Sequence, residues 1–175
     1  MDKELEREMR LLLDKRAIEE CLLRYTRGID RMDEAMIRSA FHDDAIDNHS
    51  RFVRGQIGGM LDWWLPLQSE REATQHFAMN QTIDLDGDVA HSEAYFLCLI
   101  KMNGSDRATL SGGRYADRFE RREGQWKIAL RVVLSEWKLE CDAASREELA
   151  IRAIDIGARD RTDPTYQRPL QDPVL

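Results

Sequence analysis

The feature that most constrains this chain is a change of hydrophobic period near residue 73. Beyond it, apolar and β-branched residues form four runs, at about 73–85, 89–102, 107–122 and 125–139. The dipeptides between them are Asp86-Gly87, Asn103-Gly104 and Glu123-Gly124, and such pairs are typical of β-hairpin turns. Because connections this short join antiparallel neighbours, the pattern predicts a β-meander and not a series of βαβ units. Gly112-Gly113, inside the third run, predicts a bulge or a sharp bend.

The region before residue 73 has the period of helices. Ile18, Leu22, Tyr25 and Ile29 recur at steps of four, three and four residues, which places them on one helix face. We expect this helix over residues 14–30, with Asp14 as its N-cap and with the residues before it as a frayed extension or an arm.

Three further elements are expected in the first half of the chain. Asp33 is placed to cap a short second helix, and a strand is expected over about 45–53. A third helix begins after Gly55, and Pro66 should kink or end it.

The C-terminal region has its own helix signals. Ser145 and Glu148 form a capping-box pair, and Gly157 is expected at the C-cap. Pro164, Pro169 and Pro173 then predict an extended tail. We therefore expect one domain over 1–158 and a tail over 159–175.

Composition limits the classes of function. A chain of 175 residues with a net charge of -7 lacks the concentrated positive charge of a nucleic-acid-binding protein. No apolar run approaches the length of a membrane helix, and the charged N-terminus does not fit a signal peptide. Three widely spaced cysteines fit reduced thiols better than a disulfide framework or a zinc site. We expect a cytoplasmic protein without nucleic-acid or membrane partners.

The predicted elements describe an α+β fold in which a curved antiparallel sheet wraps around helices and leaves a conical cavity. Several strings within residues 14–140 resemble the SnoaL-like branch of the nuclear transport factor two superfamily. They are Ala17-Ile18-Glu19-Glu20, Tyr25-Thr26-Arg27-Gly28-Ile29-Asp30, Phe41-His42-Asp43-Asp44-Ala45, the run from Gly112 to Arg122, and Gly124-Gln125-Trp126-Lys127-Ile128. The resemblance implies a cone-shaped barrel. Open sheets of this type usually cover their exposed face by self-association, so a homodimer or homotrimer is expected.

Asp30 and His76 are the candidate catalytic pair. The resemblance places them where scytalone dehydratase, hexachlorocyclohexane dehydrochlorinase and bile-acid dehydratases carry an Asp-His dyad. It therefore implies a lyase of the dehydratase type, which needs no cofactor or metal, acting on a small apolar or aromatic ring compound. Histidine suits proton abstraction from carbon because its pKa lies near neutral pH. An isomerase or cyclase could use the same pair, and the fold also serves as a non-catalytic binding or assembly module.

Five further residues are candidates for substrate binding: Tyr25, His49, Trp64, Tyr115 and Arg131. Tyr25 precedes Asp30 by about one helical turn, and Arg131 is similar in position to the pocket arginine of the dehydrochlorinase. Scytalone dehydratase carries a second histidine on the following strand, but Tyr95-Phe96-Leu97-Cys98 contains none. Scytalone itself is therefore not the expected substrate.

Structural alternatives stay open for these residues. Asp30 fits a turn or cap position, and Arg131 fits an exposed salt bridge at a strand end. His76 shares its strand face with Ala78 and Asn80 by simple alternation, and that polar face fits solvent as well as a pocket.

Overall fold

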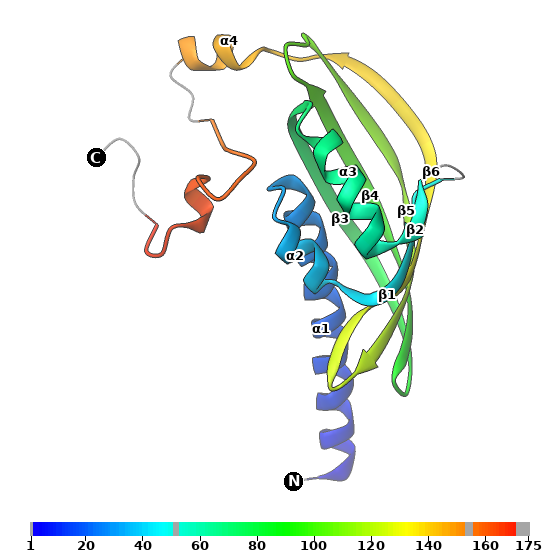
Figure 1. The fold of residues 1–175 in the computed structure, drawn as a ribbon. Helices are drawn as coiled ribbons and strands as arrows, with labels where there is room; N and C mark the ends of the chain where they lie inside the picture. The colour runs from blue at the N-terminus through cyan, green and yellow to red at the C-terminus, as the bar shows by residue number, and fades with distance from the viewer. Residues whose placement is uncertain (1, 51–52, 153–155, 171–175) are drawn as a thin grey trace.

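The computed structural model describes residues 2–50, 53–152 and 156–170. Three helices lie on the concave side of one curved six-stranded sheet, and the N-terminal part of α1 extends beyond the sheet (Figure 1). This is the α+β architecture expected from the sequence. Among the described residues, no helix combines the length and the apolar character that a membrane span requires.

Helix α1 spans Lys3–Asp30 and is capped by Asp2, whose side chain accepts a hydrogen bond from the Glu4 N–H. The expectation that it begins at Asp14 is wrong. Residues 3–13 are rich in good helix formers, whereas hydrophobic spacing marks only the buried part of the helix. Asp14 instead accepts a hydrogen bond of 2.8 Å from the indole N–H of Trp126.

The elements after α1 differ from expectation mainly at their ends. Asp33 caps helix α2 (Glu34–Ser39) as predicted, by accepting a bond from the Met36 N–H. The strand expected over 45–53 is instead β1 (Phe41–Asn48), and β2 (Arg54–Gln56) returns antiparallel to it. The predicted bounds were wrong because the chain already turns after β1; residues 51–52 of that prediction lie outside the described residues.

Helix α3 spans Ile57–Gln68 and contains Pro66 in its last turn. The proline therefore stands near the end of the helix, where little of the helix remains to be disrupted.

The four long strands are β3 (Arg71–Asp86), β4 (Val89–Met102), β5 (Arg107–Arg122) and β6 (Gln125–Asp142). The sheet order is β2-β1-β6-β5-β4-β3, antiparallel throughout except for the parallel pair β1–β6. The predicted meander is therefore confirmed. Its register shifts between Gly112 and Gly113, where the sequence predicted a bulge.

A second bulge in β3 changes which side chains face the helices. Met79 pairs with Tyr95, whereas Thr82 pairs with Glu93, so β3 carries one extra residue here. Asn80 adopts a φ of 50°, a left-handed conformation that asparagine tolerates. The extra residue reverses the inward and outward alternation of the strand. Asn80 is exposed, so the expectation that it shares the face of His76 is wrong.

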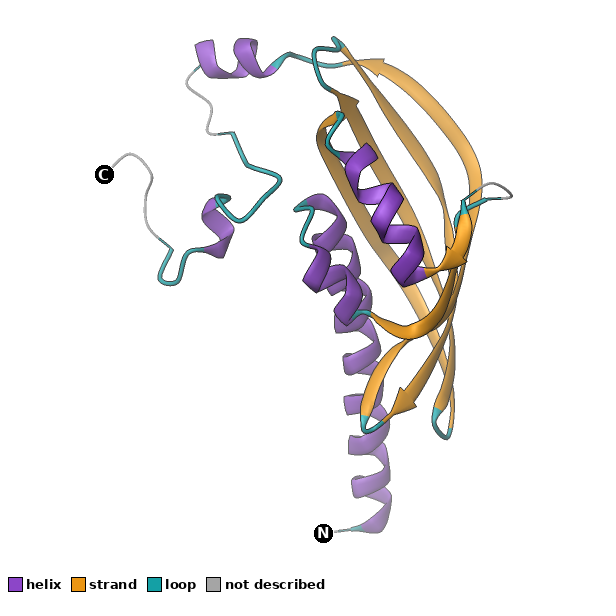
Figure 2. Cartoon of the chain, viewed as in Figure 1, coloured by secondary structure: helices purple, strands orange, loops and turns teal. Residues whose placement is uncertain are grey.

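The core lies between the concave face of the sheet and helices α1–α3 (Figure 2). Its largest fully buried apolar side chains are Tyr25, Phe41, Phe119, Ile18, Leu22, Ile29, Ile37, Leu61 and Ile128.

The C-terminal segment folds back onto the domain. The capping box of Ser145 starts helix α4 as predicted, but α4 ends at Ile151 (Arg146–Ile151), so Gly157 is not its C-cap. Residues 153–155 of the expected helix, and Pro173, lie outside the described residues. The tail contains the short 3-10 helix η1 (Pro164–Tyr166). The hydroxyl of Tyr166 donates to Asp33.

Arg159 fastens this segment near the end of α1. Its guanidinium donates to the carbonyl oxygens of Gln68 and Arg71, at 2.7 and 2.8 Å. A longer bond of 3.4 Å reaches the carbonyl of Asp30. One side chain thus joins the ends of α1 and α3 to the start of β3.

Candidate active site

A cavity of about 240 Å³ lies between α1, α3 and the concave face of the sheet. Its wall combines aromatic and aliphatic side chains with a few polar groups, as small-molecule sites usually do. Its polar and aromatic side chains include Tyr25, His49, Trp64, Arg71, His76, Cys98 and Tyr115.

Asp30 and His76 meet at this cavity. His76 Nδ1 lies 2.6 Å from Asp30 Oδ1, and the backbone N–H of His76 donates to Asp30 Oδ2 at 2.9 Å. The two side chains are 10% and 15% exposed, so the alternative of a solvent-facing His76 is wrong. Since a carboxylate only accepts hydrogen bonds, the contact places a proton on Nδ1 and leaves Nε2 directed toward the cavity.

The electrostatics of His76 follow from these contacts. Burial alone would lower the pKa of the imidazole, but the hydrogen bonds and charges of Asp30 and Cys98 outweigh it and raise the pKa to about 9. The pair therefore stabilises the imidazolium form.

Cys98 is the residue at Nε2 of His76, with Sγ at 3.2 Å. It lies directly opposite His76 in the β3–β4 ladder, so both side chains project from the same face. Cys98 was not among the predicted site residues, because in the sequence it only ends Tyr95-Phe96-Leu97-Cys98, a strand segment without a second histidine. Counting paired residues back from the hairpin turn at Gly87 places Cys98 within one residue of the position opposite His76. The bulge in β3 then sets the register that pairs the two residues directly.

A second polar array combines Tyr25 of α1 with Asp47 and His49, which lie at the end of β1 and just after it. His49 Nε2 lies 3.3 Å from the hydroxyl of Tyr25, and His49 Nδ1 lies 2.9 Å from Asp47 Oδ1. Burial, followed by the negative charge of Asp47, raises the pKa of Tyr25. The hydroxyl therefore stays protonated and can donate. Asp47 is completely buried, and sequence reasoning did not select it as a site residue.

Arg131 lies behind the cavity wall and not on it. Its guanidinium donates to both oxygens of Asp117, at 2.8 and 2.6 Å, and is completely buried. It stacks between Tyr25 and Tyr115, 4.1 and 4.2 Å from the ring centroids. The exposed salt-bridge alternative is therefore wrong, and the position also differs from the substrate contact expected for this residue.

The charge of Arg131 is secured by Asp117. Burial would lower the pKa of the guanidinium, but the adjacent carboxylate raises it well above its ordinary value. The buried pair thus holds two cavity tyrosines in place by cation–π contact.

Arg71 is the cation that does line the cavity. Within the described part of the chain, no hydrogen bond or ion pair occupies its guanidinium. Burial lowers its pKa, although arginine remains charged. No sequence signal distinguished Arg71 from other charged residues at the start of β3.

The remaining predicted contacts, Trp64 and Tyr115, also line the cavity. The rings of Trp64 and His49 lie 6.4 Å apart, and Tyr115 stacks on Phe96 at 4.6 Å. Among residues 2–50, 53–152 and 156–170, no three His, Cys, Asp or Glu side chains are grouped as metal ligands would be.

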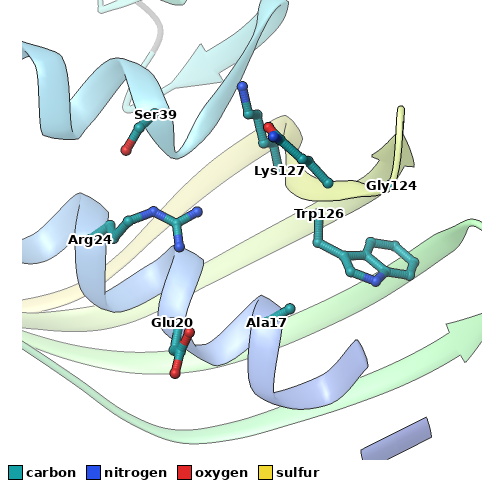
Figure 3. A pocket seen from close by; sticks show the side chains of 8 residues that line it. Ala17, Glu20, Arg24, Ser39, Gly124, Trp126 and Lys127 are labelled. Atoms are coloured by element: carbon teal, nitrogen blue, oxygen red, sulfur yellow. The ribbon is translucent and has the colours of Figure 1, made fainter. Parts of the chain in front are cut away.

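A second pocket, of about 500 Å³, lies beside α1 and the β5–β6 turn (Figure 3). Glu20, Arg24 and Lys127 line it together with Trp126. It contains no histidine or cysteine, so it lacks the acid–base pair of the first cavity.

Comparison with known proteins shows the family. Residues 10–132 match the SnoaL-like domain model, which is more than half of the chain, and the protein belongs to this family. No curated protein matches it significantly.

Solved structures show the same fold. A candidate scytalone dehydratase from Novosphingobium aromaticivorans is 20% identical, with a TM-score of 0.67 over 77% of this chain and 91% of that one. A hexachlorocyclohexane dehydrochlorinase of type 3 from Novosphingobium barchaimii is also 20% identical, with a TM-score of 0.70 over 77% and 94%. A cystatin-like protein of unknown function from Nostoc punctiforme is 20% identical, with a TM-score of 0.60 over 71% and 92%.

Proposed function

We propose that this SnoaL-like protein is a cofactor-independent lyase, of the dehydratase type, that acts on a small and mostly apolar cyclic molecule. The observation that carries the proposal is the hydrogen-bonded Asp30–His76 pair, whose Nε2 atom faces a cavity lined by aromatic side chains. Two solved structures with the same fold are named as a dehydratase and a dehydrochlorinase, and this supports elimination as the reaction class.

In this mechanism His76 Nε2 removes a proton from a carbon next to a carbonyl or a leaving group. Asp30 holds the ring in the required tautomer and stabilises the imidazolium that forms, as the aspartate does in a serine-protease triad. The 2.6 Å contact at Nδ1 supports this role.

Tyr25 supplies the proton for the leaving group in this mechanism. Tyr25 remains a neutral hydroxyl, and His49 with the buried Asp47 can return a proton to it. Arg71 can hold negative charge that develops on an enolate or on a departing halide. Arg131 acts through the tyrosine rings as a positioning residue.

The raised pKa of His76 sets the pH dependence of this reaction. Only the neutral imidazole accepts a proton, so the reactive fraction should grow as pH rises toward about 9. Turnover that instead falls steadily across neutral to alkaline pH would contradict His76 as the base.

Two other functions compete with elimination. An isomerase or cyclase would use the same proton abstraction but return the proton at another carbon. A binding module would need the cavity but no acid–base pair. Product analysis separates elimination from isomerisation or cyclisation, because only elimination releases water or halide.

The test uses a panel of hydroxylated and halogenated ring compounds with the full-length chain. His76→Gln and Asp30→Asn should reduce turnover by about 10²-fold or more, because general base catalysis typically contributes that much. The matched control is His91→Gln, since His91 is exposed and outside the cavity. Circular dichroism checks that the variants fold. Equal turnover in wild type and both dyad variants would refute the mechanism, and ligand binding without turnover would favour the binding module.

We also propose that a second copy of the chain covers the outer face of the sheet. Phe77, Tyr95, Trp137 and Leu139 are exposed there, on the strand face opposite to His76 and Cys98. Light scattering should show a homodimer or homotrimer that Phe77→Glu dissociates. Leu12→Glu, on the exposed part of α1, is the control. A monomeric wild type at high concentration would contradict self-association.

A further inference from the structure

We propose that Cys98 is a nucleophile of the cavity, activated by His76 and Asp30, which captures electrophilic ligands such as α,β-unsaturated carbonyl compounds as thioethers. Sγ, the imidazole and the carboxylate form one continuous chain, with contacts of 3.2 Å at Nε2 and 2.6 Å at Nδ1. A nucleophile beside a base that is itself oriented by a third group is the general arrangement of nucleophilic catalysis.

The position of Cys98 is set by the sheet. The bulge in β3 shifts the β3–β4 pairing by one residue, which brings Cys98 instead of Leu99 opposite His76. Directly paired residues of neighbouring strands project from the same face at close distance. Cys98 and Ser111, which is its partner on β5, both line the cavity. The thiol is therefore held against the imidazole by backbone register and not by a flexible loop.

The direction of proton transfer follows from the dyad. Because Asp30 accepts the Nδ1 proton, the neutral ring presents the Nε2 lone pair to the thiol. Transfer of the S–H proton to Nε2 gives a thiolate beside an imidazolium, and the thiolate is the reactive form of cysteine. Burial alone would lower the pKa of His76, but the partners on both sides of the ring raise it to about 9, so the ring readily holds the proton that it accepts.

Other groups facing the cavity act in the same direction or remain neutral. The titratable and charged side chains that line it besides Cys98 and His76 are Tyr25 from α1, His49 after β1, Arg71 from β3 and Tyr115 from β5. Arg71 contributes positive charge, which stabilises a thiolate. The pKa values of both tyrosines are raised, chiefly by burial, so they add no negative charge.

The proposed step is an addition that needs no other reactant. The Cys98 sulfur forms a bond to the β-carbon of the ligand, and the C=C π electrons move to give an enolate. The Nε2 proton of His76 then passes to the α-carbon. The net change is addition of S–H across the double bond, without oxidation or reduction. This proton delivery is the reverse of the proton abstraction in the proposed lyase reaction.

The two other cysteines provide internal references. Cys21 is completely buried, its thiol donates to the carbonyl of Ala40, and burial raises its pKa to about 11. Cys141 is exposed near the end of β6, far along the strand from the cavity. Cys21 should therefore be inert, and Cys141 should react as an ordinary exposed thiol.

The experiment measures alkylation of the folded full-length chain by N-ethylmaleimide and by the smaller acrylamide, both of which are α,β-unsaturated carbonyl compounds. Peptide mass spectrometry gives a separate rate for each cysteine. At about pH 6.5, Cys98 should react about tenfold faster than Cys141 with at least one reagent, because His76 Nε2, 3.2 Å from Sγ, can accept the thiol proton as the sulfur attacks. His76→Gln and Asp30→Asn should remove this advantage, while His91→Gln should keep it.

Two results would overturn the proposal. The first is that Cys98 reacts more slowly than Cys141 with both reagents, and the second is that Cys98 reacts at the same rate in wild type and in His76→Gln. The Cys141 rate in each variant reports whether the reagent is still active, and continued protection of the buried Cys21 reports whether the chain is still folded. Because labelling needs no turnover, failure of the lyase proposal would leave this result unaffected, and the converse also holds.

Discussion

The substitution Asp30→Asn tests the electrostatic coupling at the centre of the site. It removes a charge but keeps the size of the side chain, at a position where the carboxylate contacts both the backbone N–H and Nδ1 of His76. The difference between a pKa of about 9 and the ordinary 6.5 corresponds to about 3 kcal/mol of preference for the charged ring. Asp30 supplies part of this, so we expect the variant to lose about 2 kcal/mol of it.

The sign of the pH effect is fixed by the direction of the shift. The folded-state pKa of His76 is raised, so its contribution to stability is fully present below about pH 6.5. It is lost as pH rises through about 9. The difference in unfolding free energy between wild type and Asp30→Asn should therefore be largest near pH 6. Near pH 10 only about 1 kcal/mol should remain, from the altered hydrogen bonds.

Urea unfolding at about pH 6, 7.5 and 10 measures this difference, with His91→Gln as the control. An NMR titration of the histidine ring protons gives the pKa of His76 directly, and in Asp30→Asn it should fall well below 9, because Cys98 alone then opposes the effect of burial. A stability difference that does not vary with pH, together with an unchanged pKa of His76, would refute the coupling.

Three further substitutions probe the surroundings of the site. A Cβ at Gly113 would overlap with the carbonyl oxygen of Leu134 on β6, so Gly113→Ala should cost about 3 kcal/mol of unfolding free energy. In the same measurement Gly59→Ala, whose Cβ would meet nothing within 4 Å, should be neutral or stabilising by up to about 1 kcal/mol. Arg131→Met leaves the buried carboxylate of Asp117 without its partner and should lower the unfolding free energy by about 3–5 kcal/mol. Adding Asp117→Asn should recover part of this loss, and full stability of the single variant would show that the ion pair is dispensable. Cys98→Ala removes a contribution that raises the pKa of the dyad imidazole, so the NMR titration and any pH–rate profile should move to lower pH, and an unmoved titration would contradict the thiol–imidazole contact.

Much of the fold could be predicted from local sequence. Gly87, Gly104 and Gly124 all have positive φ at the turns, where the backbone conformation favours glycine over other residues, so the meander was visible in the chain itself. The ends of elements were less predictable. Helix α1 extends well before the first buried residue, because helix propensity and capping continue where hydrophobic spacing no longer gives a signal.

The site depended more on tertiary structure. Residue type and family resemblance selected Asp30 and His76, because a carboxylate and an imidazole have few equivalent substitutes in proton transfer. Residue type did not reveal Arg71 or Asp47, since isolated charged residues are common on surfaces, and only burial shows which of them face a cavity or a core. It also misplaced Arg131, which lies beneath the wall formed by the tyrosine rings.

The sequence by itself thus determined most of the helices and the hairpins, because these follow from periodicity and turn chemistry, and the family resemblance selected Asp30 and His76 as the candidate pair. Tertiary structure alone decided what the pair touches. If the β3–β4 pairing continued from the turn at Gly87 without a bulge, Leu99 would lie opposite His76. The one-residue bulge near Asn80 places Cys98 there instead. Since a one-residue shift exchanges the faces of a strand, this bulge determines whether the imidazole meets a thiol or a leucine.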